Sequence, residues 1–476
     1  MIFSDILFTK NFEGDNFMAL SAKEKKRRRM KANITAIVAI FLVLVIAISA
    51  VVIFTKGNDD KKKPEGSFIN NIVQTTEDPT PKKISEITIG STGDVLMHKP
   101  VYNSCYNSSS KTYDFTELFR YVAPNIEKYD YFVANLETTL AGNENGRRYT
   151  SYPCFNTPDP IADALKNAGV DCLLTANNHC YDTATHGIHR TQQIISEKGF
   201  DYVGTVTDPA NKRYIVEDIK GIKVGIACFT YETKTDPDRK AINGILVSKE
   251  TDDLINSFNY DRLDEFYTEL GSQLEGMKNE GAEVLTVYIH WGDEYTLKAN
   301  SYQEKMAQKM CDMGVDVIVG GHPHVVQPVD LLSSTTDPEH KTVCVYSLGN
   351  MVSNQRRQNM RLKSGHTEDG MIFEMTFSKY SDGTVVFEKV NVVPTWVHMY
   401  TSGGKRRYNV VPLVKDLSSS ADSLGLNKTS SGKSSAESSY KRTWELVEEG
   451  LIESNNYLSS LPRPDEKIPE TTDNIS

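Results

Sequence analysis

Residues 279–290, NEGAEVLTVYIH, combine a glycine suited to ending a helix, a short acidic turn, a strand-like run and a terminal histidine. The same order of features recurs in residues 167–179, NAGVDCLLTANNH, and in residues 312–324, DMGVDVIVGGHPH. Glycine favours the turn that follows a helix, and the mainly apolar run fits a strand buried on both faces. Each stretch therefore predicts a helix and a buried strand, with metal-binding residue types where the strand ends.

Two further predicted strands end in the same way. Ile87–Gly90 leads to Asp94, and Tyr131–Ala134 leads to Glu137. Because ligands of open α/β sheets bind beyond the carboxyl ends of the strands, we expect these side chains to share one edge of a sheet. A single such residue is usually an ordinary surface or core residue, so the prediction depends on their coincidence. The predicted set is Asp94, Glu137, Asn178, His290, His322 and His324.

Strand-like and helix-like segments alternate from Glu86 to about Val414, which predicts a layered α/β fold with mostly parallel strands. The predicted strands are Ile87–Gly90, Tyr131–Leu136, Asp171–Thr175, Lys223–Phe229, Glu283–His290, Asp316–Val319 and Thr342–Tyr346. The predicted helices are Glu117–Tyr129, Ile161–Ala168, Ile188–Lys198, Leu263–Asn279 and Gln303–Met313. A late β-hairpin is predicted from Met371–Phe377 and Val385–Val393.

The chemistry of the predicted ligands indicates the class of metal. Carboxylates, an amide oxygen and imidazoles together suit Mn²⁺, Fe, Zn²⁺ or Mg²⁺ better than they suit a metal that prefers thiolates. A carboxylate shared by two such cations, roughly 3.5–4 Å apart, would let the pair activate water and stabilise the oxygens of a displacement. We therefore expect a site for two divalent cations, whose identity the sequence does not give.

The run Ile34–Phe54 is apolar except for Thr35 and Ser49, and its 21 residues match the ~30 Å core of a membrane. Residues 1–32 carry a net charge of +4 and the remainder carries −14. The positive-inside rule predicts a cytoplasmic segment 1–32, an anchor over 33–55 and an extracellular remainder. The alternative is a cleaved signal peptide, for which Ala47–Ser49 resembles a cleavage site.

Composition divides the rest of the chain. Residues 56–85 are polar and predict a linker, and residues 86–414 carry the α/β pattern. Residues 415–476 are rich in serine, and Asp416–Ser439 also in lysine and aspartate, which predicts a largely disordered tail with one short helix over Tyr440–Leu451. The net charge of −10 argues against nucleic acid as a partner. The seven cysteines include no CxxC pair, so no thiolate metal site is indicated.

Several short motifs follow one another along the chain: Gly93-Asp94, Ala134–Glu137, Asn177-Asn178-His179 with Asp182, His290-Trp291-Gly292, Gly321–His324 and Ser347–Asn350. Taken in this order, they resemble the CapA family of poly-γ-glutamate capsule proteins, which is related to calcineurin-like metallophosphoesterases. The resemblance spans about Glu86 to Val411. It implies a four-layer α/β/β/α sandwich, and it implies work at the cell membrane with partners that synthesise, export or attach a polyanionic polymer.

The resemblance also implies roles for individual residues. Asp94 and His324 would hold the first metal, Glu137 would bridge, and the second metal would be held by Asn178, His290 and His322. His179 would protonate the leaving group or steady the transition state. Asp182 would either orient His179 or cap the following helix.

Two departures from the phosphoesterase pattern affect these expectations. Leu96 occupies the histidine position of the Asp-x-His motif, and His98 two residues later is a possible substitute. Glu137 stands where an aspartate is usual. Because metal occupancy and phosphatase activity depend on such positions, turnover is left open.

Basic clusters suggest where an anion would bind. Arg356 and Arg357 follow the Ser347–Asn350 motif, and further basic residues occur at Arg147-Arg148 and Lys405–Arg407. They predict contacts to phosphate or polymer carboxylates, with solvated loops as the alternative. Three functions remain: a capsule-polymer protein with two metals, a general hydrolase of phosphoesters or amides at the cell surface, and a polymer-binding module without catalysis.

Overall fold

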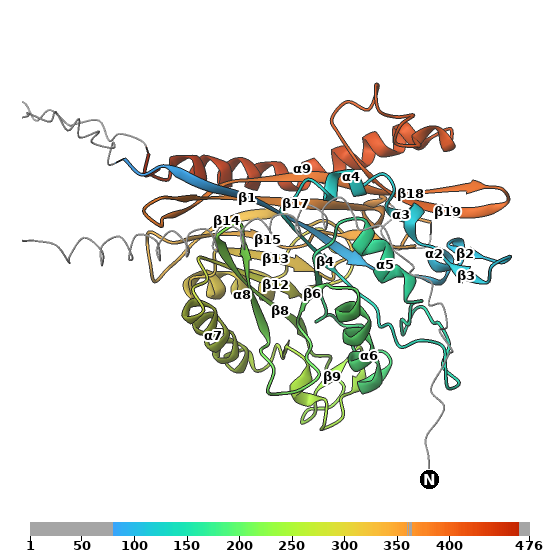
Figure 1. Ribbon diagram of the computed structural model, residues 1–476, viewed down its shortest axis with the longest axis horizontal. Coiled ribbons are helices and arrows are strands. Elements are labelled where there is room, and N and C mark those ends of the chain that lie inside the picture. Colours follow the sequence, from blue (N-terminus) through green and yellow to red (C-terminus); the bar gives the residue numbers. More distant parts are fainter. Residues whose placement is uncertain (1–79, 359, 361–363, 466–476) are drawn as a thin grey trace, which may run out of the picture. The chain divides into compact units, whose positions relative to one another are not determined.

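Two mixed β-sheets form the centre of the computed structural model, which describes residues 80–358, 360 and 364–465 (Figure 1). The first sheet has the strand order β19-β18-β17-β1-β4-β5-β6, and β16 pairs with β1 beside this path. Its strands are β1 (Lys83–Val95), β4 (Tyr131–Asn135), β5 (Cys172–Leu174), β6 (Asp201–Val203), β16 (Asn350–Val352), β17 (Asp369–Tyr380), β18 (Val385–Ser402) and β19 (Lys405–Pro412).

The second sheet has the order β11-β8-β12-β13-β15-β14, with β7 paired to β8. Its strands are β7 (Tyr214–Ile219), β8 (Ile222–Tyr231), β11 (Ser257–Phe258), β12 (Val284–His290), β13 (Val317–Gly321), β14 (Val329–Ser333) and β15 (Lys341–Val345). In both sheets the strands that carry predicted ligands are parallel to their neighbours: β1 pairs with β4, and β12 with β13. The antiparallel strands β14, β17, β18 and β19 make the sheets mixed rather than mostly parallel.

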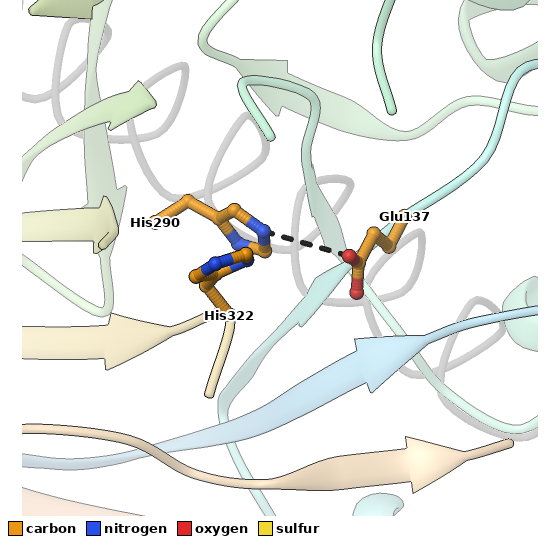
Figure 2. Close-up of side chains that lie close together, drawn as sticks. All are labelled: Glu137, His290 and His322. Atoms are coloured by element: carbon orange, nitrogen blue, oxygen red, sulfur yellow. Dashed lines mark ion pairs between the residues drawn. The ribbon is translucent and has the colours of Figure 1, made fainter. Parts of the chain in front are cut away.

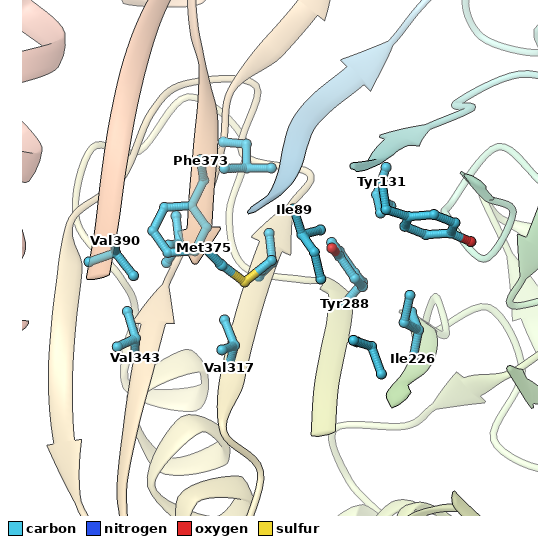
Figure 3. Close-up of a cluster of buried hydrophobic side chains, with 14 of the residues drawn as sticks. Ile89, Tyr131, Ile226, Tyr288, Val317, Val343, Phe373, Met375 and Val390 are labelled. Atoms are coloured by element: carbon cyan, nitrogen blue, oxygen red, sulfur yellow. The ribbon is translucent and has the colours of Figure 1, made fainter. Parts of the chain in front are cut away.

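The two sheets share one hydrophobic core, because alternate residues of each strand point toward the other sheet. Figure 3 shows Ile89, Tyr131 and Phe373 of the first sheet near Tyr288 and Val317 of the second. The intervening residues face outward: Phe132 and Ala134 of β4 join the core beneath the first sheet's helices, while Val287 and Ile289 of β12 join that beneath the second sheet's helices.

Helices cover the outward faces of the sheets (Figure 1). Those of the first sheet are α2 (Lys99–Ser104), α3 (Thr116–Phe119), α4 (Ala123–Ile126), α5 (Pro160–Asn167) and α6 (Ala184–Glu197). Those of the second sheet are α7 (Leu263–Asn279) and α8 (Ser301–Asp312). Two small hairpins complete this part of the fold: β2 (Tyr106–Asn107) with β3 (Thr112–Tyr113), and β9 (Ala241–Ile242) with β10 (Ile245–Leu246). The prediction of an α/β fold is confirmed.

Residues 117–129 differ from the prediction of one helix. The segment forms two short helices, α3 (Thr116–Phe119) and α4 (Ala123–Ile126). Pro124 lies in the first turn of α4, where its missing N–H costs nothing, but its ring prevents a helix from running through it.

The tail also differs from its prediction. Instead of one short helix over Tyr440–Leu451 in a disordered segment, helix α9 covers Gly432–Ser460, which is 29 residues. Its Val447, Leu451 and Leu458 belong to the core between the sheets. The serines that suggested disorder include Ser439 and Ser454, which are fully buried. Small side chains let a helix approach closely, so polar composition was a poor guide here.

The predicted cytoplasmic segment 1–32, the anchor 33–55 and most of the linker 56–85 lie outside the described residues. Within residues 80–358, 360 and 364–465, no helix combines the length and apolar character needed to cross a membrane. All seven cysteines are unpaired.

Candidate metal centre

The six predicted ligands gather at the carboxyl ends of neighbouring strands. Asp94 is the penultimate residue of β1, and His290 is the final residue of β12. Glu137 follows β4, Asn178 follows β5, and both His322 and His324 follow β13. Their side chains come from both sheets, and their exposed fractions lie between 0% and 4%. Figure 2 shows His290 and His322 beside one another and facing Glu137.

Two groups of potential ligands share one carboxylate. Glu137, His290 and His322 form one group, and Asp94, Glu137 and His324 form the other. Within each group the ligand atoms lie within 4.8 Å of one another, which is the spacing at which three side chains can hold one cation. Glu137 belongs to both groups, so its carboxylate lies where a bridging ligand would be.

Backbone positions around the ligands are crowded. A Cβ atom on Gly93 would lie 1.8 Å from the carbonyl oxygen of Gly349, and one on Gly320 would lie 2.0 Å from that of Tyr346. His322 and His324 have φ angles of 97° and 56°, a left-handed region that is unfavourable for residues other than glycine. The fold thus holds these two imidazoles in place at a conformational cost, which is common at functional sites.

Glu137 is the most unusual group of the site. Its side chain is fully buried, and neither carboxylate oxygen has a hydrogen-bond partner. The nearest basic atoms are Nε2 of His290 and Nε2 of His324, at 3.5 and 3.8 Å from Oε1. Burial, followed by the negative charge of Asp94, raises the pKa of Glu137 well above its ordinary value. An ionised carboxylate in this position requires a cation.

Two histidines of the site, His290 and His322, favour the neutral form. Burial lowers the pKa of His290 to about 3, and burial with the neighbouring His290 and His324 lowers the pKa of His322 well below its ordinary value. The buried Nδ1 atom of His322 has no hydrogen-bond partner. Neutral imidazoles are the form that binds metals, so no proton must be displaced from these rings.

Amide side chains hold the ligands in place. Nδ2 of Asn135 donates to Oδ1 of Asp94 at 2.8 Å, and Oδ1 of Asn350 lies 3.1 Å from Nδ1 of His324. Oδ1 of Asn178 lies 2.9 Å from Nε2 of His290. This is a hydrogen-bond distance, and it is also short enough for both atoms to bind one cation. Burial would raise the pKa of Asp94, but its hydrogen bond with His324 and the nearby imidazoles lower the pKa below its ordinary value.

His179 is linked to Asp182 beside the ligands. Its Nδ1 atom lies 2.7 Å from Oδ2 of Asp182, and its ring packs edge-on against Phe155 with centroids 4.6 Å apart. Oδ1 of Asp182 accepts a hydrogen bond from Nδ2 of Asn243 at 2.8 Å. Helix α6 begins at Ala184 and has no side-chain cap, so Asp182 orients His179 rather than capping that helix.

Comparison with known proteins bears directly on this arrangement. The family model described as "Bacterial capsule synthesis protein PGA_cap" matches residues 88–355, which include all six predicted ligands, His179 and Asp182. The chain belongs to the PGA_cap family. The resemblance to CapA proteins that the sequence motifs predict is therefore confirmed.

Named relatives support the family assignment. The chain is 29% identical over 313 residues to the capsule biosynthesis protein CapA of Bacillus anthracis, covering 62% of this chain and 68% of that protein. It is 26% identical over 285 residues to the PGA biosynthesis protein CapA of Bacillus subtilis strain 168, covering 59% and 67%. A solved Staphylococcus aureus protein, provisionally named a 5′-nucleotidase, matches at 13% identity with a TM-score of 0.37, over 70% of this chain and 55% of that one.

Two basic residues predicted to bind substrate lie in different surroundings in this PGA_cap protein. Arg356 is 6% exposed, and its guanidinium donates to the carbonyl oxygen of Val397 and pairs with Glu368 at 2.7 Å. Arg357 is exposed. A buried guanidinium needs such partners, so Arg356 stabilises the loop that precedes β17, and only Arg357 is accessible to a ligand.

His98, the possible substitute for the missing histidine at Leu96, belongs to neither ligand group. Its ring packs edge-on against Phe155 with centroids 5.2 Å apart, and its Nδ1 atom accepts a hydrogen bond from the N–H of Asn354 at 3.3 Å. His98 therefore packs behind Phe155, the ring that contacts His179.

Several residues around the site have no signal in the local sequence. Asn243 comes from the turn between β9 and β10, far from His179 in sequence, and no local pattern connects the two. Tyr231 packs on His322 with ring centroids 4.8 Å apart, and Tyr295 lies 6.1 Å from His324. Asn135 and Asn350 belong to the quoted motifs, and their positions beside predicted ligands are the signal that would have identified them.

Proposed function

We propose that this PGA_cap protein is a metal-dependent hydrolase of a capsule-polymer machinery, with two divalent cations bridged by Glu137. The observation that carries the proposal is the buried Glu137 carboxylate, which has no hydrogen-bond partner and belongs to two ligand groups at once. Burying an unpaired carboxylate is unfavourable, whereas a carboxylate between two cations is stable.

The donor set fits the proposed cations. Asp94 and His324 would hold one ion, and Asn178, His290 and His322 would hold the other, with Glu137 common to both. These oxygen and imidazole donors suit Mn²⁺, Fe, Zn²⁺ or Mg²⁺. The two packed sheets with helices on their outer faces are consistent with a metallophosphoesterase-like α/β/β/α sandwich, which we include in the proposal.

The proposed reaction is hydrolysis of an amide or phosphoester bond. Bound cations would supply an activated water and would neutralise charge on the reacting group. The chain's own contribution is His179, which follows the ligand Asn178 directly in sequence. As the imidazolium, His179 would keep its Nδ1–H toward Asp182 and give its Nε2 proton to the leaving group. Phe155 limits rotation of the ring by packing against it.

The names of the relatives suggest the setting of this reaction. They are called capsule and PGA biosynthesis proteins, and we propose a role in synthesis, export or attachment of a similar polyanionic polymer. The apolar run Ile34–Phe54 and its basic flank support a single-pass anchor with the catalytic part outside the cell. Other polymer-synthesis proteins of the membrane would be its partners.

Metal content tests the proposal. The full-length protein is purified in detergent, offered Mn²⁺, Fe²⁺, Zn²⁺ and Mg²⁺, and analysed by inductively coupled plasma mass spectrometry. We expect about two ions per chain in wild type, and about one or fewer in a His290→Ala/His322→Ala variant, which lacks two donors of one of the ions. The exposed His189, changed to alanine, is the matched control and should leave the metal content unchanged. A folded wild-type protein that takes up no metal would refute the two-metal centre.

A further inference from the structure

The β18–β19 hairpin extends well beyond the edge of the first sheet that carries the metal centre. β17 pairs antiparallel with both β1 and β18, so β18 runs in the same direction as β1. Thr92 of β1 and Val393 of β18 both pair with Ile372 of β17, so these two residues lie at the same height in the sheet. β1 ends at Val95, whereas β18 continues to Ser402, so the hairpin projects roughly 20 Å farther at about 3.3 Å per residue. This projection is visible in Figure 1.

The tip of this hairpin is basic. Lys405, Arg406 and Arg407 follow the turn directly, and Lys99 lies at the start of α2, which packs against β19. Lys405, Arg406 and Lys99 are exposed, and within the described part of the chain no carboxylate forms an ion pair with any of them. These four residues are called the basic tip below. Such a concentration is unusual in a protein with a net charge of −10.

The contact between the hairpin and α2 gives the basic tip a fixed shape. Nη1 of Arg407 donates to the carbonyl oxygen of Ser104 at 2.7 Å. Farther along β19, the hydroxyl of Tyr408 donates to Oδ1 of Asn354 at 2.6 Å. The N–H of Asn354 in turn donates to Nδ1 of His98. The ring of His98 packs against Phe155, which also packs against His179. The basic tip is therefore tied to the surroundings of the metal centre.

Two clefts border the basic tip. One has a volume of about 560 Å³ and is lined by Lys405, Arg407, Tyr400 and the β2–β3 hairpin. The other has a volume of about 520 Å³ and is lined by Lys99, Pro100, Asn103, Ser104, Lys405 and Arg406. Ser104 and Lys405 line both clefts, so the clefts meet at the tip. Together they provide a path for an extended chain rather than a flat surface.

Two carboxylates line the first cleft, and both have partners. Oδ1 of Asp114 accepts a hydrogen bond from the N–H of Thr116 at 2.9 Å. Oε2 of Glu117 lies 3.6 Å from Nη1 of Arg120. Arg120 offsets part of the charge of Glu117, whereas Asp114 keeps its charge, so the part of the cleft that favours an anion lies beside Lys405 and Arg407.

We propose that the basic tip and its two clefts bind a linear polycarboxylate chain and direct it to the metal centre. The molecule has a net negative charge, and the basic tip gathers positive charge at the same edge of the sheet as the candidate ligands, where a polyanion would be attracted. The clefts favour a chain over a membrane surface, which would need a flat face. The proposal rests on the proposed function only for the chemistry of the polymer.

Polymer binding tests the proposal directly. Fluorescently labelled poly-γ-glutamate is titrated with the full-length protein in detergent, and binding is followed by anisotropy. Reversing two charges with Lys405→Glu/Arg406→Glu should weaken binding by about tenfold or more. The control Lys128→Glu/Lys389→Glu reverses two exposed lysines at the opposite edge of the first sheet, and its affinity should stay within about twofold of wild type.

Further measurements separate the possible outcomes. Lys99→Glu alters the other wall of the second cleft and should weaken binding independently of the hairpin. Metal content is measured for every variant, so an empty metal centre would count against the proposed function without affecting the comparison of affinities. Equal affinities for the two double variants, or no binding by wild type, would overturn the docking proposal. So would a hairpin variant that loses binding to phosphatidylglycerol vesicles but keeps its affinity for the polymer.

Discussion

At the scale of single residues, His179 offers a test that separates chemistry from metal binding. Its side chain touches Asp182 and Phe155 and belongs to neither ligand group. We expect His179→Gln to lower hydrolysis of poly-γ-glutamate by about 10²- to 10⁴-fold, because the leaving group loses its proton donor. The measurement is release of new amino groups, with metal content determined in parallel. Unchanged turnover with normal metal content would remove His179 from the mechanism.

His290 predicts how the stability of the metal-free protein depends on pH. Burial lowers its pKa from 6.5 to about 3, so between these values the unfolded chain binds more protons than the native protein. Stability from this group is complete above pH 6.5 and is lost as the pH falls toward 3. Glu137, with its raised pKa, contributes in the opposite direction.

The measurement for His290 is urea unfolding after chelation, in wild type and in His290→Gln. Both proteins retain Glu137, so the difference between their slopes against pH reports mainly on His290. We expect the variant to lose less stability on acidification than wild type does. Equal slopes would mean that His290 is already protonated, or equally accessible, in the native state.

The sequence pattern indicated the candidate ligands, which the fold brings together, more readily than the residues that support them. Asp94, His290 and His322 stand at strand ends, a position that sequence reveals because an apolar run stops there. Asn243 supports the site through a contact between segments far apart in the chain, which no local pattern encodes. Arg356 was predicted to bind substrate because it lies in a basic cluster of the sequence. That cluster does not reveal that Arg356 is buried and paired with Glu368.

At the scale of elements, a glycine in α9 lies where the helix packs closely against β14, so replacing it with alanine should destabilise the protein. Replacing glycine by alanine inside a helix normally stabilises it by about 1 kcal/mol. A Cβ atom on Gly450 would lie 1.6 Å from the carbonyl oxygen of Val329 in β14. We therefore expect Gly450→Ala to destabilise the protein by about 1–3 kcal/mol in urea unfolding. Glu449→Ala, at an exposed position of the same helix, is the control and should have little effect; stabilisation by Gly450→Ala would show that α9 does not pack on β14.

The elements that sequence predicted well are those with strong local patterns. Helix α7 spans Leu263–Asn279 as predicted, and β12 starts one residue later than expected. The second strand of the predicted hairpin, Val385–Val393, is shorter than the observed β18. β18 continues to Ser402, and the carbonyl oxygen of Pro394 accepts a hydrogen bond from the N–H of Leu413 at 2.8 Å. Pairing with β19 thus sets the length of β18, which the local sequence pattern does not reveal.

At the scale of the whole molecule, the tail completes the core rather than following it. The sequence pattern placed the end of the α/β region at Val414, but α9 contributes Val447, Leu451 and Leu458 to the core between the sheets. We expect a chain that ends at Val414 to lose cooperative urea unfolding, because it exposes that core. A chain that ends at Asp465 keeps α9 and is the control. Cooperative unfolding of the shorter chain would show that the two sheets are stable alone.

The shared position of Glu137 has a consequence for the order in which metals are taken up. If two cations bind as proposed, the first would displace the proton that burial favours on this carboxylate. A second cation then meets a ligand that is already ionised and oriented. Uptake would therefore be cooperative, with singly loaded molecules scarce at every metal concentration, and the protein would respond to the supply of metal as a switch rather than in proportion to it.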